Sequence, residues 1–200
     1  RVLYISTFLL RTAFGALLLL IATYVPLEPA IDVGLEPDME QSAYEQFAAL
    51  LNVAIIAVPY PFAEMITANY FGSLSDRVGR KPVIVAGTTV AAVIVALYTL
   101  SDNVWYLAFM HGIHGIGAAA TVAPAIAMIA DHAASCDRGR QMGWFDYSTF
   151  LGYIIGAVVG GFMIDITGAV LGFVIISLLL VGSALMLYTS GTTGKPKGTV

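Results

Sequence analysis

Long runs of apolar residues alternate with short polar connections along almost the whole chain. Each run has at least 18 residues, and about 20 apolar residues in a helix cross the roughly 30 Å hydrocarbon core of a bilayer. The runs are 2–25, 47–71, 83–100, 104–130, 143–166 and 169–188. Segments of about ten residues with alternating polarity, typical of membrane β-barrels, do not occur in the sequence. The pattern predicts an all-α membrane protein with six transmembrane helices.

The composition agrees with this class. The chain is 58% hydrophobic and 11% charged, with a mean hydropathy of +0.85, whereas soluble domains carry about 25% charged residues. The net charge of −4 argues against a nucleic-acid partner, which would favour clustered Lys and Arg. The single cysteine, Cys136, excludes an internal disulfide and a Cys-based zinc site. Because Arg1 leads directly into an apolar run, we interpret the chain as a fragment.

Positive charge is distributed unevenly between the connections. Eight of the nine Lys and Arg residues lie outside the apolar runs, and all eight fall on one side if the N-terminus is cytoplasmic. The long connection 26–46 would then lie outside and carries only acidic charge. The positive-inside rule therefore predicts cytoplasmic N- and C-termini in the plasma (inner) membrane.

The connection between the second and third runs, "GSLSDRVGRKP", concentrates three cations in a short turn. Gly79 can adopt turn conformations that other residues avoid. Gly72 would let the second helix pack closely at its end, and Asp76 can face the partial positive charge of a helix N-terminus. The spacing of glycines and charges in this turn is hard to obtain by chance.

This turn resembles the signature between helices 2 and 3 of the major facilitator superfamily, which matches at Gly72, Asp76, Arg77, Gly79 and Arg80. The resemblance implies that Asp76 braces the first half of a transporter against the second. It also implies that Arg77 and Arg80 pair with an acid at the end of the fourth helix, for which Asp131 is well placed. Residues 1–188 would form two three-helix units, the first half of a twelve-helix transporter, with the missing C-terminal half as a partner.

Glycine patterns in two further runs are similar to those of the same family. The fourth run carries Gly115 and Gly117, with His111 where the family has arginine. The fifth run reads "GYIIGAVVGG" and resembles a pattern of proton-coupled drug antiporters, with Ala157 in place of the usual proline. Its matching glycines also fit a stripe of small residues for helix packing, and both interpretations stay open. These glycines are Gly152, Gly156, Gly160 and Gly161.

Ionisable residues inside predicted spans are candidates for a substrate or proton pathway, because burying a charge in lipid is costly. Arg11 and Glu64 are expected at similar depth on the first and second helices. They could form a structural ion pair, or Arg11 could engage an anionic group while Glu64 carries a coupling proton. His111 and His114 share one face of their helix and could line a cavity. Asp146 is expected at the cytoplasmic rim, and no metal site is expected.

The last residues read "TSGTTGKPKG" and resemble the phosphate-loop signature of AMP-forming acyl-CoA synthetases. A complete adenylating domain would use such a loop to bind ATP, but the rest of that domain is absent here. We therefore interpret 189–200 as a truncated cytoplasmic tail at a fusion or junction, with no enzyme activity and no cofactor. The matching residues are Thr189, Ser190, Gly191, Thr192, Thr193, Gly194 and Lys197.

Together these features predict a secondary active transporter that moves a small solute by alternating access, with proton coupling. Two alternatives stay open. One is a fragment of a fusion between a transporter and an acyl-CoA or acyl-carrier-protein synthetase. The other is a six-helix membrane protein with a structural role.

Overall fold

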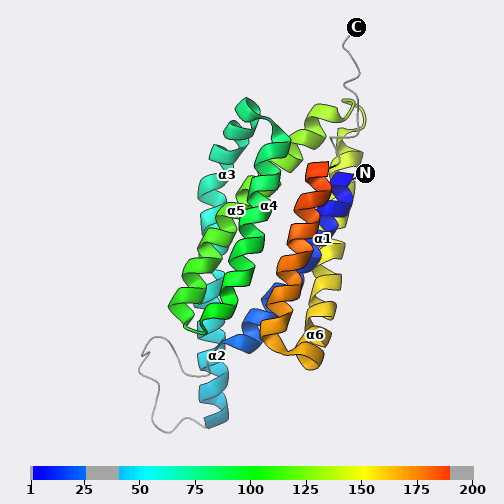
Figure 1. Cartoon of the computed structure of the whole chain (residues 1–200). Helices are drawn as coiled ribbons and strands as arrows, with labels where there is room; N and C mark the ends of the chain where they lie inside the picture. Colours follow the sequence, from blue (N-terminus) through cyan, green and yellow to red (C-terminus); the bar gives the residue numbers. More distant parts are fainter. Residues whose placement is uncertain (1, 26–40, 190–200) are drawn as a thin grey trace.

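The computed structural model describes residues 2–25 and 41–189, and this part of the chain contains helices and turns but no strand. Figure 1 shows an elongated bundle in which the helices run roughly side by side. Its elements are α1 (Val2–Tyr24), α2 (Gln41–Ala57), α3 (Pro59–Val78), α4 (Arg80–Leu97), the 3-10 helix η1 (Tyr98–Leu100), α5 (Val104–His132) and α6 (Arg138–Thr189). Five helices in the described ranges are long and apolar enough to cross a membrane.

The second apolar run forms two consecutive helices, α2 and α3, that together make one candidate span from Ala43 to Val78. The division falls at Val58, directly before Pro59. Proline has no N–H to continue the hydrogen-bond pattern, and its ring crowds the preceding turn. The segment formed by α2 and α3 is therefore longer than the predicted run 47–71, and it is divided at Pro59.

Helix α6 contains a reversal of direction at Gly168. This residue has φ 72° and ψ 169°, a conformation outside the helical region and accessible mainly to glycine. Figure 1 shows the yellow and orange parts of α6 running in opposite directions on either side of this point. The two parts correspond to the predicted runs 143–166 and 169–188.

The helices of the bundle pack around a large cluster of buried apolar residues and a second, smaller one. Helix α1 lies along α6, α3 and α4 lie against α5, and α4 also contacts α6. The buried centre includes Leu17, Leu20, Val95, Tyr98 and Phe173. Large apolar side chains such as Leu50, Phe162 and Ile166 are exposed on the outside. An apolar exterior around satisfied helical backbones is the arrangement that a lipid bilayer requires.

Candidate functional site

Glycines of α6 set the position of α1. A Cβ atom at Gly152 would lie 2.8 Å from the carbonyl oxygen of Phe8, and one at Gly160 would lie 2.7 Å from Cα of Ala16. A Cβ at Gly156 would overlap the carbonyl oxygen of Thr12. Only glycine allows the two backbones to approach this closely. Gly161 lies beside this contact, because its nearest neighbour would be Cδ1 of Leu19 at 4.0 Å.

Two glycines of α5 serve the same purpose on the other side of the bundle. A Cβ at Gly115 would overlap the backbone of Tyr60 in α3. A Cβ at Gly117 would lie 3.0 Å from the carbonyl oxygen of Gly87 in α4. These contacts hold α5 against α3 and α4, and so place the histidines of α5 in the centre of the bundle.

Arg11 lies in the middle of α1 with only 7% of its surface exposed. Its Nη1 donates a hydrogen bond of 2.7 Å to Oη of Tyr153, and its guanidinium carbon lies 5.3 Å from the centre of that ring. Its buried Nε has no hydrogen-bond partner. Arg11 is therefore a buried cation that a tyrosine hydroxyl satisfies only in part.

The direct ion pair between Arg11 and Glu64 that the sequence suggested is not formed in this structure. The ion pairs within 4.0 Å among the described residues do not include either side chain. Helix α1 packs along α6, which brings Tyr153 to Arg11, whereas Glu64 is half-buried on α3. The carboxyl group of Glu64 interacts with Arg11 only through longer-range electrostatics.

Aromatic rings surround the two buried histidines of α5. The ring of Phe14 lies 4.7 Å from that of Tyr60, and Tyr60 lies 5.3 Å from His114, measured between centroids. His111 Nδ1 forms a hydrogen bond of 2.7 Å with Oη of Tyr98. Nδ1 of His114 is buried without a hydrogen-bond partner. We call Phe14, Tyr60, His111 and His114 the aromatic cluster.

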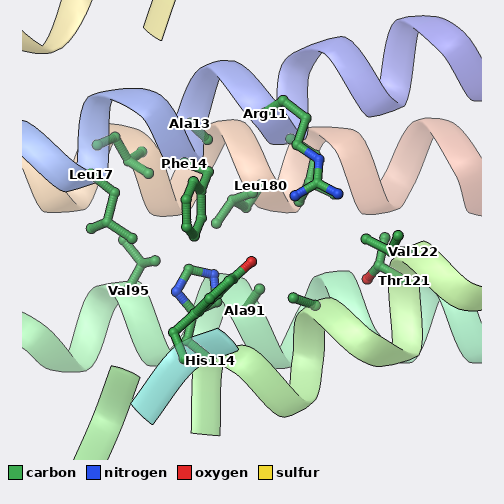
Figure 2. Close-up of a pocket in the computed structure, with 14 residues that line it drawn as sticks. Arg11, Ala13, Phe14, Leu17, Ala91, Val95, His114, Thr121, Val122 and Leu180 are labelled. Atoms are coloured by element: carbon green, nitrogen blue, oxygen red, sulfur yellow. The ribbon is translucent and has the colours of Figure 1, made fainter. Parts of the chain in front are cut away.

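A small cavity lies between Arg11 and the aromatic cluster (Figure 2). Its lining residues come from α1, α3, α4, α5 and α6, and include Arg11, Phe14, Tyr60 and His114. Its volume is about 10 Å³, which is room for a single water molecule. A larger solute could enter only if the helices moved apart.

The charged turn between α3 and α4 forms a compact network at one end of the bundle. Arg80 pairs with Asp76 at 2.5 Å and with Asp131 of α5 at 3.0 Å, and donates to Oγ of Ser75 at 2.7 Å. Gly79 has φ 98°, the turn conformation expected from the sequence. Arg77 is exposed and takes part in none of the ion pairs of the described residues.

The close packing expected at Gly72 is wrong for this structure, because a Cβ atom there would meet nothing within 4 Å. Its carbonyl oxygen instead accepts a hydrogen bond of 2.7 Å from Ser75. This bond helps to hold Ser75 in the network of Arg80.

Other predicted residues lie apart from the cavity. Asp146 is exposed near the start of α6. Thr189 is the last residue of α6, and the rest of the tail signature, Ser190 to Lys197, lies outside the described residues. In the loop before α6, hydrogen bonds from Gln141 and then Arg140 hold the pKa of Asp137 below its usual value. Where the structure describes the chain, no three His, Cys, Asp or Glu side chains gather closely enough to hold a metal.

Sequence reasoning missed the tyrosines of the site. Tyr153 stands next to Gly152 within the quoted glycine pattern, so that the helix face that packs on α1 also presents its ring to Arg11. Tyr60 follows Pro59 at the division between α2 and α3. Their positions beside glycine and proline were visible in the sequence, but the partner of each ring was not.

Comparison with known proteins identifies the family. The family model of the Major Facilitator Superfamily matches residues 3–199. The chain belongs to this superfamily. It is an integral membrane protein. The comparisons do not show the resemblance of the tail to acyl-CoA synthetases.

The curated relatives are longer than this chain. Tetracycline resistance protein, class B, of Escherichia coli is 30% identical over 151 residues, which are 74% of this chain and 37% of that protein. Inner membrane transport protein YajR of E. coli (strain K12) is 33% identical over 56% of this chain and 24% of its own length. Quinolone resistance protein NorA of Staphylococcus aureus is 23% identical over 83% of this chain and 38% of its own length. The chain therefore spans less than half the length of these relatives.

Proposed function

We propose that the chain is the N-terminal, six-helix half of a proton-coupled secondary transporter that moves a small solute across the inner membrane. Its six spans would be α1, α2 with α3, α4, α5 and the two parts of α6. The names of the relatives, which include resistance proteins and an inner membrane transport protein, support transport as the activity. The observation that carries the proposal is Arg11, a cation at mid-span beside a cavity, with one buried donor lacking a partner.

The positive charge of Arg11 in the middle of a membrane-spanning helix is energetically costly. Inserting a charged residue at the centre of a membrane helix costs about 2.5–3.5 kcal/mol on insertion scales, and such residues mark substrate and ion pathways. The hydrogen bond to Tyr153 offsets part of this cost. A structural role alone would be better served by an apolar residue of similar volume.

Alternating access would use the network around Arg80 as a gate. The ion pair of Arg80 with Asp131 links the α3–α4 turn to α5, and Asp76 pairs with Arg80 from the end of α3. Nζ of Lys81 donates a 2.7 Å hydrogen bond to the carbonyl of Tyr188 at the end of α6. These polar contacts lie on the side that the positive-inside rule assigns to the cytoplasm. Breaking and re-forming them would let the cavity open to one side at a time.

Proton coupling would use Glu64. Its carboxyl group is half-buried on α3 and forms no direct ion pair with Arg11. The carboxyl group could therefore bind and release a proton while Arg11 stays charged. No observation supports either alternative, the fusion with an acyl-CoA or acyl-carrier-protein synthetase or the six-helix membrane protein with a structural role. The relatives carry the names of transport and resistance proteins, and ATP would be a cofactor only if the tail belonged to a complete adenylating domain.

The test uses the intact protein in inverted membrane vesicles that hold an acidic interior. A dye that reports the pH gradient is monitored while tetracycline or a quinolone is added, two solutes chosen from the names of the relatives. We expect solute-dependent release of protons, lost in Glu64→Gln and kept in the control Asp102→Asn, which changes an exposed acid. Solute exchange without a gradient should persist in Glu64→Gln. Proton release that survives in this variant would contradict the assignment of Glu64.

A further inference from the structure

The proposed function leaves open which class of solute binds in the cavity at Arg11. We infer that this cavity recognises the carboxylate of an organic anion with a flat aromatic body, with Arg11 as the binding residue and Tyr153 as the residue that positions it. The inference rests on the proposed transport function, because it names the class of solute that this site would select.

The charge of the site comes from Arg11. Its side chain is nine-tenths buried, its Nη1 is engaged by Tyr153, and its Nε is buried without a partner. A guanidinium presents five N–H donors in a planar fork that matches the two oxygens of a carboxylate. An unsatisfied buried donor is costly, so an incoming carboxylate would gain a hydrogen bond that the chain itself does not make.

The chain does not supply its own anion here. In the described part of the protein, the direct ion pairs involve Arg80 and Arg140, and Arg11 is absent from them. Glu64 does not line the cavity, although its carboxyl group interacts with Arg11 at longer range. A cationic solute at this position would therefore meet Arg11 without a facing carboxylate. The site should select anions first, neutral solutes second and cations last.

The remainder of the cavity suits an aromatic body. Phe14, Tyr60 and His114 present rings on the side of the cavity away from the guanidinium, as Figure 2 shows for Phe14 and His114. Their centroids lie 4.7 to 5.9 Å apart, the range in which aromatic rings pack favourably. The free Nδ1 of His114 adds one polar contact. Thr121 also lines the cavity, with its hydroxyl donating a hydrogen bond of 2.9 Å to the carbonyl of Gly117, and the remaining lining residues, such as Leu17 and Val95, are apolar.

Tyr153 fixes where the cation points. Its hydroxyl accepts a hydrogen bond from Nη1 of Arg11, and its ring belongs to the helix that packs against α1 through Gly152 and Gly156. At these two glycines the backbones of α1 and α6 lie so close together that an added Cβ atom would overlap α1. Arg11 is thus held against α6, and the space for a solute must open on the side of α3 and α5.

The experiment measures binding to the intact, purified protein by isothermal titration calorimetry. Its probes are 1-naphthoate, the neutral 1-naphthamide and the cation 1-naphthylmethylammonium, which share one aromatic body. We expect naphthoate to bind at least tenfold more tightly than naphthamide, since hydrogen bonds to charged groups contribute about 1.5–3 kcal/mol, or about 10- to 150-fold. The cation should bind most weakly.

Variants connect this order to the site. Arg11→Lys keeps the charge but loses the fork, and should weaken naphthoate binding about tenfold while binding of naphthamide stays unchanged. Tyr153→Phe should weaken naphthoate binding less, whereas Tyr147→Phe, an exposed tyrosine of the same helix, should change nothing. Arg11→Met should remove the preference for the anion. If this variant fails to fold, Arg11→Lys and Tyr153→Phe still test whether Arg11 and Tyr153 bind the carboxylate.

Equal binding of the three probes, or stronger binding of the cation, would overturn the inference. So would a preference for naphthoate that Arg11→Lys and Tyr153→Phe leave untouched. The transport assay with proton release is independent of this measurement. Anion binding that depends on Arg11, without any proton-coupled flux, would refute the proposed transport function but support the anion site. Proton-coupled flux without a preference for the anion would support the transport function but refute the anion site.

Discussion

Replacing Gly160 and Gly161 separately with alanine tests the contact that positions Arg11. The two residues are neighbours in α6 at the same depth, but of the two only Gly160 lies against the backbone of α1. A Cβ at Gly160 would lie 2.7 Å from Cα of Ala16 and 2.9 Å from its carbonyl oxygen. At Gly161 the nearest atom would be 4.0 Å away, an ordinary van der Waals contact.

The magnitude follows from these distances. Carbon atoms pack best at about 3.5–4.0 Å, so alanine at 160 requires the two helices to separate by close to 1 Å. Overpacking of this kind typically costs about 1–3 kcal/mol. Alanine also favours a helix over glycine by about 0.5–1 kcal/mol, but this gain applies to both variants. Gly160→Ala should therefore have a free energy of unfolding about 1–3 kcal/mol lower than that of Gly161→Ala.

The assay is unfolding of the intact protein in mild detergent, titrated with sodium dodecyl sulfate and followed by far-UV circular dichroism. Gly182→Ala is a second control, because a Cβ there would meet nothing within 4 Å. Gly161→Ala and Gly182→Ala should both be as stable as the unaltered protein or slightly more stable. Equal unfolding free energies for the 160 and 161 variants would show that α1 and α6 are not in close contact there.

Three further predictions concern topology, the gate and the site. In a Cys136→Ser background, a cysteine that replaces Asp38 should react with an impermeant thiol reagent added from outside. A cysteine that replaces the exposed Ser73 should react only after the membrane is permeabilised, and reversed labelling would refute the orientation. Asp76→Asn in the intact transporter should slow transport without loss of solute binding, because Asp76 pairs with Arg80 far from the cavity; normal rates with lost binding would contradict this role. In double-mutant cycles of unfolding free energy, Arg11→Met should couple more strongly to Tyr153→Phe than to Glu64→Gln, since only Tyr153 is in hydrogen-bond contact with Arg11, and the opposite order would be inconsistent with the structure.

Much of the candidate gate was predictable from the sequence. The positive φ of Gly79 follows from the motif, and the family resemblance implied the pairing of Arg80 with Asp131. The same expectation included Arg77, which takes part in none of the ion pairs of the described residues. The close packing of Gly152, Gly156 and Gly160 was also one of the two interpretations of their four-residue spacing. The expectation for Gly72 failed, because one glycine at a helix end does not specify a neighbouring surface.

The site at Arg11 was only half predictable, for a physical reason. Hydropathy sums along the chain, so a sequence alone determines which segments enter the membrane and how deep Arg11 and Glu64 lie. Equal depth does not make two residues neighbours, because each can point to any side of its helix. The tight contact of α1 with α6 directs Arg11 to Tyr153, and the packing of α5 on α3 brings His114 to Tyr60. These choices of partner depend on which helix faces meet, and only the tertiary structure decides them.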